Sequence, residues 1–555
     1  MENLARHAHR VWQQHDAAPL AATGAAIGVA SHLLYWMHGL RTPQAAAIFW
    51  SHLAAFTLIL TLGILSSHGG ALPCLALCAS YLAGVFTSMT VYRLFFHPLR
   101  KFPGPVTARV SLLHGLFRDK YKSHERLARW CDEYGSDIVR IGPMDLVVRS
   151  ADAVAKTQTL CGKRGTGTFE SFAYEGTWFS LEALMDNDEH RRRRAVWDRA
   201  QNGKAMAKYE IDTRTVSRTW LERLSSLDGA PVEVTSAMLL VAFDNMGKIG
   251  FSKEFGTVTT GQGVKWLALL SSFLRQGAGL AMVTWPLLII DSVGEFGEVA
   301  EFSRISADMH EDRFQRDDPS LEDFYKYFLE DFRSEKPTSF FNKRDLHADT
   351  DALLIAATDT VSVTLAWIFY YLTRHPDIRA KLYEEIKPAY GKTIPGEFKD
   401  ADLSKLEYLG AVINEALRIR PVAGLNTPRV TPPGGIEIDG VWIPGEVQVW
   451  TPPWLLGRYE KYFPHADEFI PERWTTRPEL VVDRRAFIPF NAGRWGCAGK
   501  KVAMMLMRLM VAYTLFEHDF DFAPGEDGTA IVRDSVNNIV IKPGKMHLCF
   551  KRRSG

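Results

Sequence analysis

The stretch "FIPFNAGRWGCAGK", residues 487–500, decides how the rest of this sequence is interpreted. It places Cys497 among three glycines, directly before a helical pattern. Backbone N–H groups and the dipole at the start of a helix stabilise a thiolate. Glycines let a large flat ligand approach the backbone closely, and Phe490 is placed to shield the sulfur from water. The stretch therefore predicts a cysteinate ligand, with a buried free cysteine in a glycine-rich turn as the alternative.

These features suit a cysteinate bound to haem iron, where the thiolate pushes electron density that favours O–O cleavage. The stretch also resembles the haem loop of the cytochrome P450 family of haem-thiolate monooxygenases, Phe-x-x-Gly-x-Arg-x-Cys-x-Gly. The matching residues are Phe490, Gly493, Cys497 and Gly499. One position departs from the family pattern, because Trp495 stands where the family has arginine, and Arg494 precedes it. The resemblance implies that Cys497 ligates the iron of haem b, and that either Arg494 or the indole N–H of Trp495 contacts a propionate.

Residues 356–361, "AATDTV", put an acid beside an alcohol inside the longest apolar helical pattern. A buried acid costs solvation. A threonine can turn its hydroxyl to the carbonyl four residues back, here Ala356, and bend the helix. A satisfied polar pair in a core helix is the alternative. The family's Ala/Gly-Gly-x-Asp/Glu-Thr motif corresponds to Asp359 and Thr360, with Ala357 replacing a glycine. The resemblance implies that the pair relays protons to O2.

Charged motifs before the cysteine add to the resemblance. Glu415 and Arg418 stand three residues apart, on one face of a predicted helix. With Arg473 in "PERW" they match the family's Glu-x-x-Arg and Pro-Glu-Arg motifs, which implies a structural ion-pair network. A surface salt bridge is the alternative for an isolated Glu-x-x-Arg.

Three further residues resemble family positions that contact the haem propionates. In "EHRRRRAVWDRAQ", residues 189–201, His190 and Arg194 stand four apart and share a helix face. Arg429 follows the Glu-x-x-Arg helix and matches a third propionate-binding position. For the other arginines of residues 189–201 a solvated basic face is the alternative, and no nucleic-acid role is expected.

Hydrophobic periodicity predicts a mainly α fold with small β-sheets. Helices are expected over 124–135, 189–201, 346–375, 377–386, 409–420 and 500–516, and β-structure over 137–148, 435–450 and 547–552. The resemblance implies a cytochrome P450-like haem-thiolate fold for residues 106–555, behind an N-terminal anchor.

The first hundred residues differ from the remainder. Three apolar blocks, 20–40, 45–65 and 71–92, are each about as long as a membrane-spanning helix. The first block carries a histidine, so residues 1–96 are expected to form an anchor of two to three transmembrane helices. Basic residues follow the third block and place the large domain in the cytosol. The proline-rich residues 97–105 are expected to act as a tether.

Composition limits the function classes. The chain of 555 residues has a net charge of +1, which argues against nucleic-acid binding. Its six scattered cysteines are typical of a reducing compartment. Because no G-x-G-x-x-G fingerprint is present, electrons are expected from a partner. The resemblance implies an NADPH–cytochrome P450 reductase docking near Lys500 and Lys501, the endoplasmic reticulum membrane, O2 as co-substrate, and a lipophilic small molecule as substrate.

Substrate contacts are expected from residues near the predicted haem loop and proton-relay helix. The candidates are Phe169, Phe172, Tyr174, Ala356, Val422 and Leu425. Two alternative functions stay open: a haem-thiolate isomerase, dehydratase or peroxide-using enzyme, and a non-catalytic membrane haem-binding protein.

Overall fold

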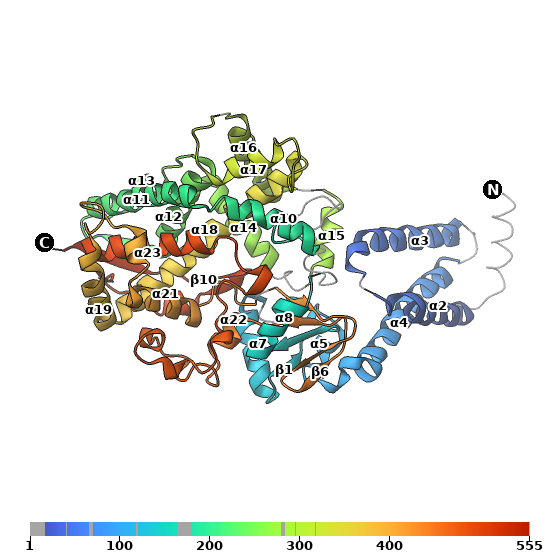
Figure 1. Ribbon diagram of the computed structural model, residues 1–555. Helices are drawn as coiled ribbons and strands as arrows, with labels where there is room; N and C mark the ends of the chain where they lie inside the picture. Colours follow the sequence, from blue (N-terminus) through green and yellow to red (C-terminus); the bar gives the residue numbers. More distant parts are fainter. Residues whose placement is uncertain are drawn as a thin grey trace.

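The computed structural model describes residues 17–39, 41–65, 70–117, 120–163, 180–278, 283–294, 296–316, 318–425 and 427–553. A small helical unit from the first hundred residues stands beside a large body of helices and short strands (Figure 1). The prediction of a mainly α fold with small sheets is confirmed.

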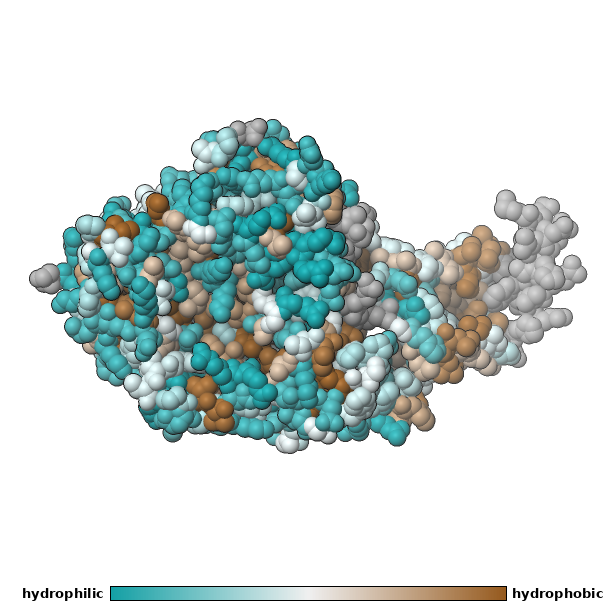
Figure 2. All heavy atoms as spheres, viewed as in Figure 1, coloured by the Kyte–Doolittle hydropathy of each residue, from teal (hydrophilic) through white to brown (hydrophobic). Residues whose placement is uncertain are grey.

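Three N-terminal helices are long and apolar enough to cross a membrane, over Ala18–Trp36, Thr42–Leu65 and Ala71–Phe96. Many of their large hydrophobic side chains are exposed, and brown patches mark hydrophobic residues on the face of this unit that Figure 2 shows. A fourth helix of this length and composition, over Lys343–Arg374, is mostly buried in the body. The N-terminal elements are α2 (Ala17–Ser31), η1 (His32–Trp36), η2 (Thr42–Gln44), α3 (Ala45–Leu65), α4 (Ala71–Val91) and η3 (Tyr92–Phe96).

Glycines let α2 and α4 touch backbone to backbone. A Cβ at Gly28 would lie 2.2 Å from the carbonyl oxygen of Tyr81, and a Cβ at Gly84 would lie 2.3 Å from that of Ala25. Small residues at such crossings are typical of helix pairs inside membranes. The first apolar block is therefore paired with the third along its length.

Helices make up most of the body. They are η4 (Pro98–Lys101), α5 (Val106–Val110), α6 (His114–Phe117), η5 (Lys120–Lys122), α7 (Ser123–Glu133), α8 (Ala151–Leu160), α10 (Asn187–Arg199), α11 (Gly203–Ser226), α12 (Val234–Phe251), α13 (Thr257–Thr260), α14 (Lys265–Ala278), α15 (Trp285–Asp291), α16 (Gly297–Gln315), α17 (Phe324–Phe332), α18 (Lys343–Arg374), α19 (Pro376–Ile386), η7 (Lys387–Ala389), α20 (Asp400–Leu403), α21 (Glu407–Ile419), α22 (Pro453–Gly457), η8 (Pro471–Trp474), η9 (Pro478–Leu480), η10 (Arg484–Ala486), η11 (Gly493–Trp495), α23 (Lys500–Glu517) and α24 (Ala530–Arg533).

The strands are short and form small sheets. They are β1 (Ile138–Arg140), β2 (Asp145–Val148), β3 (Pro231–Glu233), β4 (Arg429–Val430), β5 (Ile436–Ile438), β6 (Val441–Ile443), β7 (Gln448–Trp450), β8 (His518–Phe522), β9 (Val536–Asn538), β10 (Val540–Lys542) and β11 (His547–Arg552). One sheet has the order β1-β2-β7-β4, a second the order β3-β11-β8, and β5–β6 and β9–β10 are separate antiparallel pairs.

Helix α18 passes through the main hydrophobic core. Its apolar side chains pack there with those of α11, α12, α17, α19, α21 and α23. Asn342 caps its start, since the amide oxygen accepts the backbone N–H of Asp345 at 3.0 Å. The core fixes α18 beside α21, which carries Glu415 and Arg418, and beside α23, which follows the loop of Cys497.

The proline-rich residues 97–105 are packed on the body. Leu99 and Phe102 are buried in a cluster with side chains from the sheet that contains β1. The carbonyl oxygen of Pro103 accepts the backbone N–H of Arg140 at 2.7 Å. This segment therefore joins the N-terminal helices to the sheet through buried contacts.

Candidate active site

The predicted thiolate loop lies directly before α23. The backbone N–H of Cys497 donates to the carbonyl oxygen of Phe490 at 2.7 Å, and that of Gly496 to Gly493 at 3.1 Å. Gly499 precedes the first helical residue, and no side chain caps the helix. The free N–H groups at this helix start are therefore available to the sulfur.

Cys497 differs from the other five cysteines because its side chain is exposed while they are buried or half-buried. Surrounding protein nevertheless desolvates the thiol and raises its pKa, while the backbone N–H groups of Gly499 and Lys500 and the charge of Arg194 act in the opposite direction. Cys497 is thus exposed as a residue while neighbouring protein still desolvates its thiol.

The position that departs from the family pattern is turned inward. Trp495 is buried, and the ring of His190 lies 4.4 Å from its own, edge to face. Arg494 points outward instead, because its guanidinium donates to the carbonyl oxygen of Thr159 at 3.1 Å and is exposed. Of the two candidates for a propionate contact, the geometry therefore favours Trp495.

Lys163 joins this cluster, and sequence reasoning missed it. Its ammonium lies 4.3 Å from the ring centroid of Trp495 and donates to the backbone carbonyl of Glu182. Gly162 and Val430 exchange two backbone hydrogen bonds, which brings Lys163 beside Arg429, the third residue predicted to contact a propionate. No local signal marks Lys163, because the contact depends on packing between α8 and β4.

The cluster is positively charged. Burial and the charge of Arg429 lower the pKa of Lys163 to about 7. Burial, together with Lys163 and nearby arginines, lowers the pKa of His190 to about 3. Within the described residues, the indole N–H of Trp495 and the Nε–H of Arg429 are buried without hydrogen-bond partners. Such a cluster fits an anionic ligand with several acceptor oxygens.

Residues of α10 and of the turn after it form hydrogen bonds with the loop that carries Cys497. Arg194 donates to the carbonyl oxygen of Gly496 at 2.6 Å and pairs with Asp198 at 2.9 Å. Gln201, which sequence reasoning also missed, donates to the carbonyl oxygen of Ala498 at 2.7 Å. Arg194 thus contacts the loop that carries the thiol.

The acid and alcohol predicted for proton relay lie in the middle of α18. The hydroxyl of Thr360 donates to the carbonyl oxygen of Ala356 at 2.6 Å, so the predicted hydrogen bond is confirmed. Asp359 is buried and forms an ion pair with Lys542 at 2.9 Å. Ala356 is exposed although its helix runs through the core, so that side of α18 is open.

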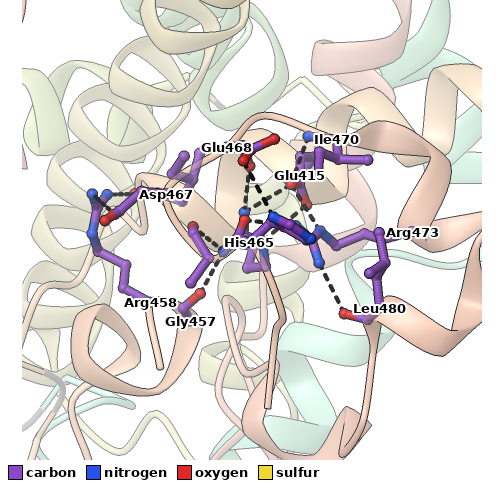
Figure 3. Close-up of polar contacts among 12 residues, drawn as sticks. Glu415, Gly457, Arg458, His465, Asp467, Glu468, Ile470, Arg473 and Leu480 are labelled. Carbon is purple, nitrogen blue, oxygen red and sulfur yellow. Dashed lines mark hydrogen bonds and ion pairs between the residues drawn. The ribbon is translucent and has the colours of Figure 1, made fainter. Parts of the chain in front are cut away.

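The predicted ion-pair network is buried and complete (Figure 3). Glu415 accepts two hydrogen bonds from Arg418, at 2.7 and 2.9 Å, and one from Arg473 at 2.9 Å. It also accepts the backbone N–H of Ile470 and the indole N–H of Trp474, at 3.0 and 2.9 Å. The surface salt bridge, the alternative for this motif, is therefore excluded.

Both arginines of the network also donate hydrogen bonds to backbone carbonyl oxygens. Arg418 donates to the carbonyl oxygens of Gly457, Ala466 and Glu468, and Arg473 to those of Pro464, His465 and Leu480. These bonds offset the cost of burying three charges. They also fasten the segment between α22 and η9 to α21.

Comparisons with known proteins agree with this geometry. A family model described as Cytochrome P450 matches residues 113–550. The chain belongs to the cytochrome P450 family. It is therefore a haem-thiolate monooxygenase, whose family uses haem with a cysteine thiolate and O2.

Fungal P450 monooxygenases are among the relatives of this P450. Cytochrome P450 monooxygenase sthD of Phaeosphaeria nodorum is 34% identical over 505 residues, covering 85% of this chain and 99% of that protein. Tryprostatin B 6-hydroxylase of Aspergillus fumigatus is 28% identical, covering 91% of this chain and 92% of that protein. A crystal structure of the cytochrome P450DA heme domain superposes with a TM-score of 0.68 at 18% identity, covering 82% of this chain and 98% of that one.

One interpretation of the basic helix in this P450 is corrected. Arg193, left as part of a possible solvated face, is buried and pairs with the buried carboxylate of Asp349 at 3.0 Å. The carboxylate also accepts the backbone N–H of Leu181 at 2.6 Å. Arg191 and Arg192 are exposed, as expected for a solvated face. Burial of Arg193 ties α10 to α18.

The candidate substrate contacts of the P450 are only partly placed. Phe169, Phe172 and Tyr174 lie outside the described residues. Val422 is half-buried, and its carbonyl oxygen accepts the backbone N–H of Ile541 at 2.8 Å. Leu425 is buried in a cluster that includes Leu127, Trp454 and Ile541.

Proposed function

We propose that this chain is a membrane-bound P450 that oxidises a lipophilic small molecule with O2 and with electrons from NADPH delivered by a reductase. The observation that carries the proposal is the placement of Cys497, whose open but desolvated sulfur faces the uncapped start of α23. That environment suits an axial thiolate. The relative named tryprostatin B 6-hydroxylase favours hydroxylation as the reaction, in secondary metabolism.

The residues around the loop would hold haem b. Cys497 would supply the axial sulfur, and the glycines at 493 and 499, with Phe490, would let the ring approach and shield the sulfur. The propionates would be held by the indole N–H of Trp495 and by the polar side chains of the residues around it. Those residues are His190, Arg194, Arg429 and Lys163. When bound, the haem supplies the oxygen chemistry.

Replacing Lys163 with methionine is expected to accelerate haem loss by about ten- to a hundredfold, because a charge-assisted hydrogen bond contributes about 1.5–3 kcal/mol. The measurement is haem transfer from the purified protein to excess apomyoglobin. Adding Trp495→Arg restores the family's arginine and should slow the loss again. The control is Lys156→Met, a surface lysine of the neighbouring α8.

The same experiment has a predicted pH dependence. Without a ligand the pKa of Lys163 is lowered to about 7, by burial and then by Arg429, with Glu182 acting in the opposite direction. The two propionates of a bound haem would raise the pKa of Lys163 again, so haem binding takes up a proton. Haem retention therefore weakens as pH rises above about 7. A pH profile that is the same in wild type and Lys163→Met would contradict the assignment.

Asp359 and Thr360 would deliver protons in the O2 reaction, and the open face at Ala356 would adjoin the substrate, with Val422 and Leu425 nearby. Thr360→Ala is expected to divert NADPH electrons to hydrogen peroxide several-fold more often, since the donor hydroxyl is removed. The measurement is peroxide released per NADPH consumed. Thr373→Ala is the matched control, because its hydroxyl makes the same bond to the carbonyl four residues back, at 2.8 Å. Equal coupling in the two variants would count against the relay role.

The three apolar N-terminal helices fit membrane anchoring. We place residues 1–96 in the endoplasmic reticulum membrane as a multi-pass anchor, residues 97–105 at the junction, and the catalytic domain 106–555 in the cytosol. Lys500 and Lys501 are exposed at the start of α23, beside the thiolate loop, and would help the reductase to dock.

Co-expression with the reductase in microsomes, followed by product screening of lipophilic compounds, tests the proposal. Product formation that requires NADPH and the reductase supports it. Conversion without NADPH would favour an isomerase, dehydratase or peroxide-using enzyme. The acid–alcohol pair of Asp359 and Thr360 argues for the monooxygenase, because those alternatives need no proton relay to O2. A haem-loaded protein that converts nothing would favour a non-catalytic haem-binding protein.

A further inference from the structure

The buried acid of α18 is paired with a residue from the far end of the sequence. The Nζ of Lys542 lies 2.9 Å from Oδ1 of Asp359. The Asp359 side chain is 3% exposed, whereas the Lys542 side chain is 19% exposed. The lysine therefore reaches from a partly solvated position to an acid that is closed off from water.

Lys542 opposes the effect of burial on this acid. Desolvation raises the pKa of Asp359, and within the described residues Lys542 is the charged group that lowers it, by its charge and by its hydrogen bond. No other ionisable group of the described elements packed around Asp359 contributes to that pKa. A buried carboxylate without this partner would take up a proton at neutral pH.

The second oxygen of the carboxylate is not used by the pair. Oδ2 of Asp359 is buried and has no hydrogen-bond partner within the described residues, and the same holds for the hydroxyl of Thr358. The Thr360 hydroxyl, next on the helix, donates to Ala356 instead. The carboxylate is thus held at one oxygen, while the other oxygen is buried and has no hydrogen-bond partner among the described residues.

The lysine is fixed by the hairpin that carries it. Lys542 ends β10, and the preceding Ile541 donates its backbone N–H to Val422 at 2.8 Å and packs in the cluster of Leu425. On β9, the amide of Asn537 donates to the hydroxyl of Ser123 at 2.9 Å. Anchored on both strands, the hairpin presents a pre-positioned ammonium to α18.

We propose that Lys542 is the positioning residue for Asp359 in proton delivery, an inference that rests on the proposed monooxygenase function. The ammonium holds Oδ1 and keeps the carboxylate ionised between turnovers. Oδ2 takes up a proton that bulk solvent supplies as hydronium and passes it on toward the O2 site, which restores the carboxylate. Lys542 keeps its own protons throughout.

The first test needs no substrate or reductase. The infrared C=O band of the protonated carboxyl, assigned by its loss in Asp359→Asn, is followed against pH in the purified full-length protein. In Lys542→Met the midpoint is expected to rise by on the order of one pH unit or more, whereas Lys542→Arg keeps it near wild type. The control is Lys545→Met, an exposed lysine three residues further on.

The second test uses the protein reconstituted with reductase in phospholipid vesicles. Lys542→Met is expected to release several-fold more peroxide per NADPH consumed. The pH dependence of this release should shift in the same direction as the infrared midpoint. Lys542→Arg should release as little peroxide as wild type. In an Asp359→Asn background Lys542→Met should add nothing further, because the group it positions is gone.

The outcomes separate the inference from the proposed function. An unchanged infrared midpoint in Lys542→Met, or a changed midpoint with unchanged coupling, overturns the inference. A wild-type protein that consumes no NADPH with its reductase overturns the proposed function and, with it, the role in proton delivery. Unfolding temperatures and haem content equal to wild type show that a change in coupling is not a folding defect.

Discussion

Replacing Cys497 with alanine is expected to abolish the thiolate-type Soret band of the reduced, carbon-monoxide-bound protein. Methyl carries no lone pair, so the variant loses the sulfur of Cys497, the exposed cysteine just before the start of α23. The effect is complete loss, because no other described cysteine is exposed. The absorption spectrum of the purified protein supplied with haemin is the measurement.

The matched control is Cys131→Ala. Cys131 is fully buried in an apolar cluster, and burial raises the pKa of its thiol to about 11, so it is no candidate ligand. Its replacement should leave the spectrum unchanged. A thiolate-type spectrum that survives in Cys497→Ala would refute the assignment of the ligand, and with it the proposed chemistry.

The second large effect is expected for Glu415→Ala. The substitution leaves Arg418 and Arg473 buried without their common anion, and breaking a buried ion pair costs about 3–5 kcal/mol. Whole domains are stable by only about 5–15 kcal/mol, so a large share of the free energy of unfolding is lost. Urea denaturation and the yield of folded, haem-loaded protein measure the loss.

Glu468→Ala controls for this prediction. Its carbonyl oxygen accepts a bond from Arg418, but its side chain is 66% exposed at the surface. Removing that side chain should change the urea midpoint little. If Glu415→Ala unfolds at the same urea concentration as Glu468→Ala, the network does not stabilise the fold in the way proposed.

Local motifs were predictable because their geometry is set within one or two helical turns. The hydroxyl of Thr360 reaches the carbonyl of Ala356 on any regular helix, and Glu415 and Arg418 meet at a spacing of three. Helical periodicity likewise predicted α18, α21 and α23 to within a few residues. Helices α11 and α12 were not singled out, although they carry much of the core.

The sequence by itself determined the thiolate loop, the acid–alcohol pair, the charged motifs and the apolar N-terminal blocks, since each is a pattern among neighbouring residues. Only the tertiary structure decided that Trp495 turns inward and Arg494 outward, and that Lys163 and Lys542 join the site. Those contacts link elements far apart in the chain. Their distances follow from how helices and strands pack around α18. The spacing of residues along the sequence does not specify that packing.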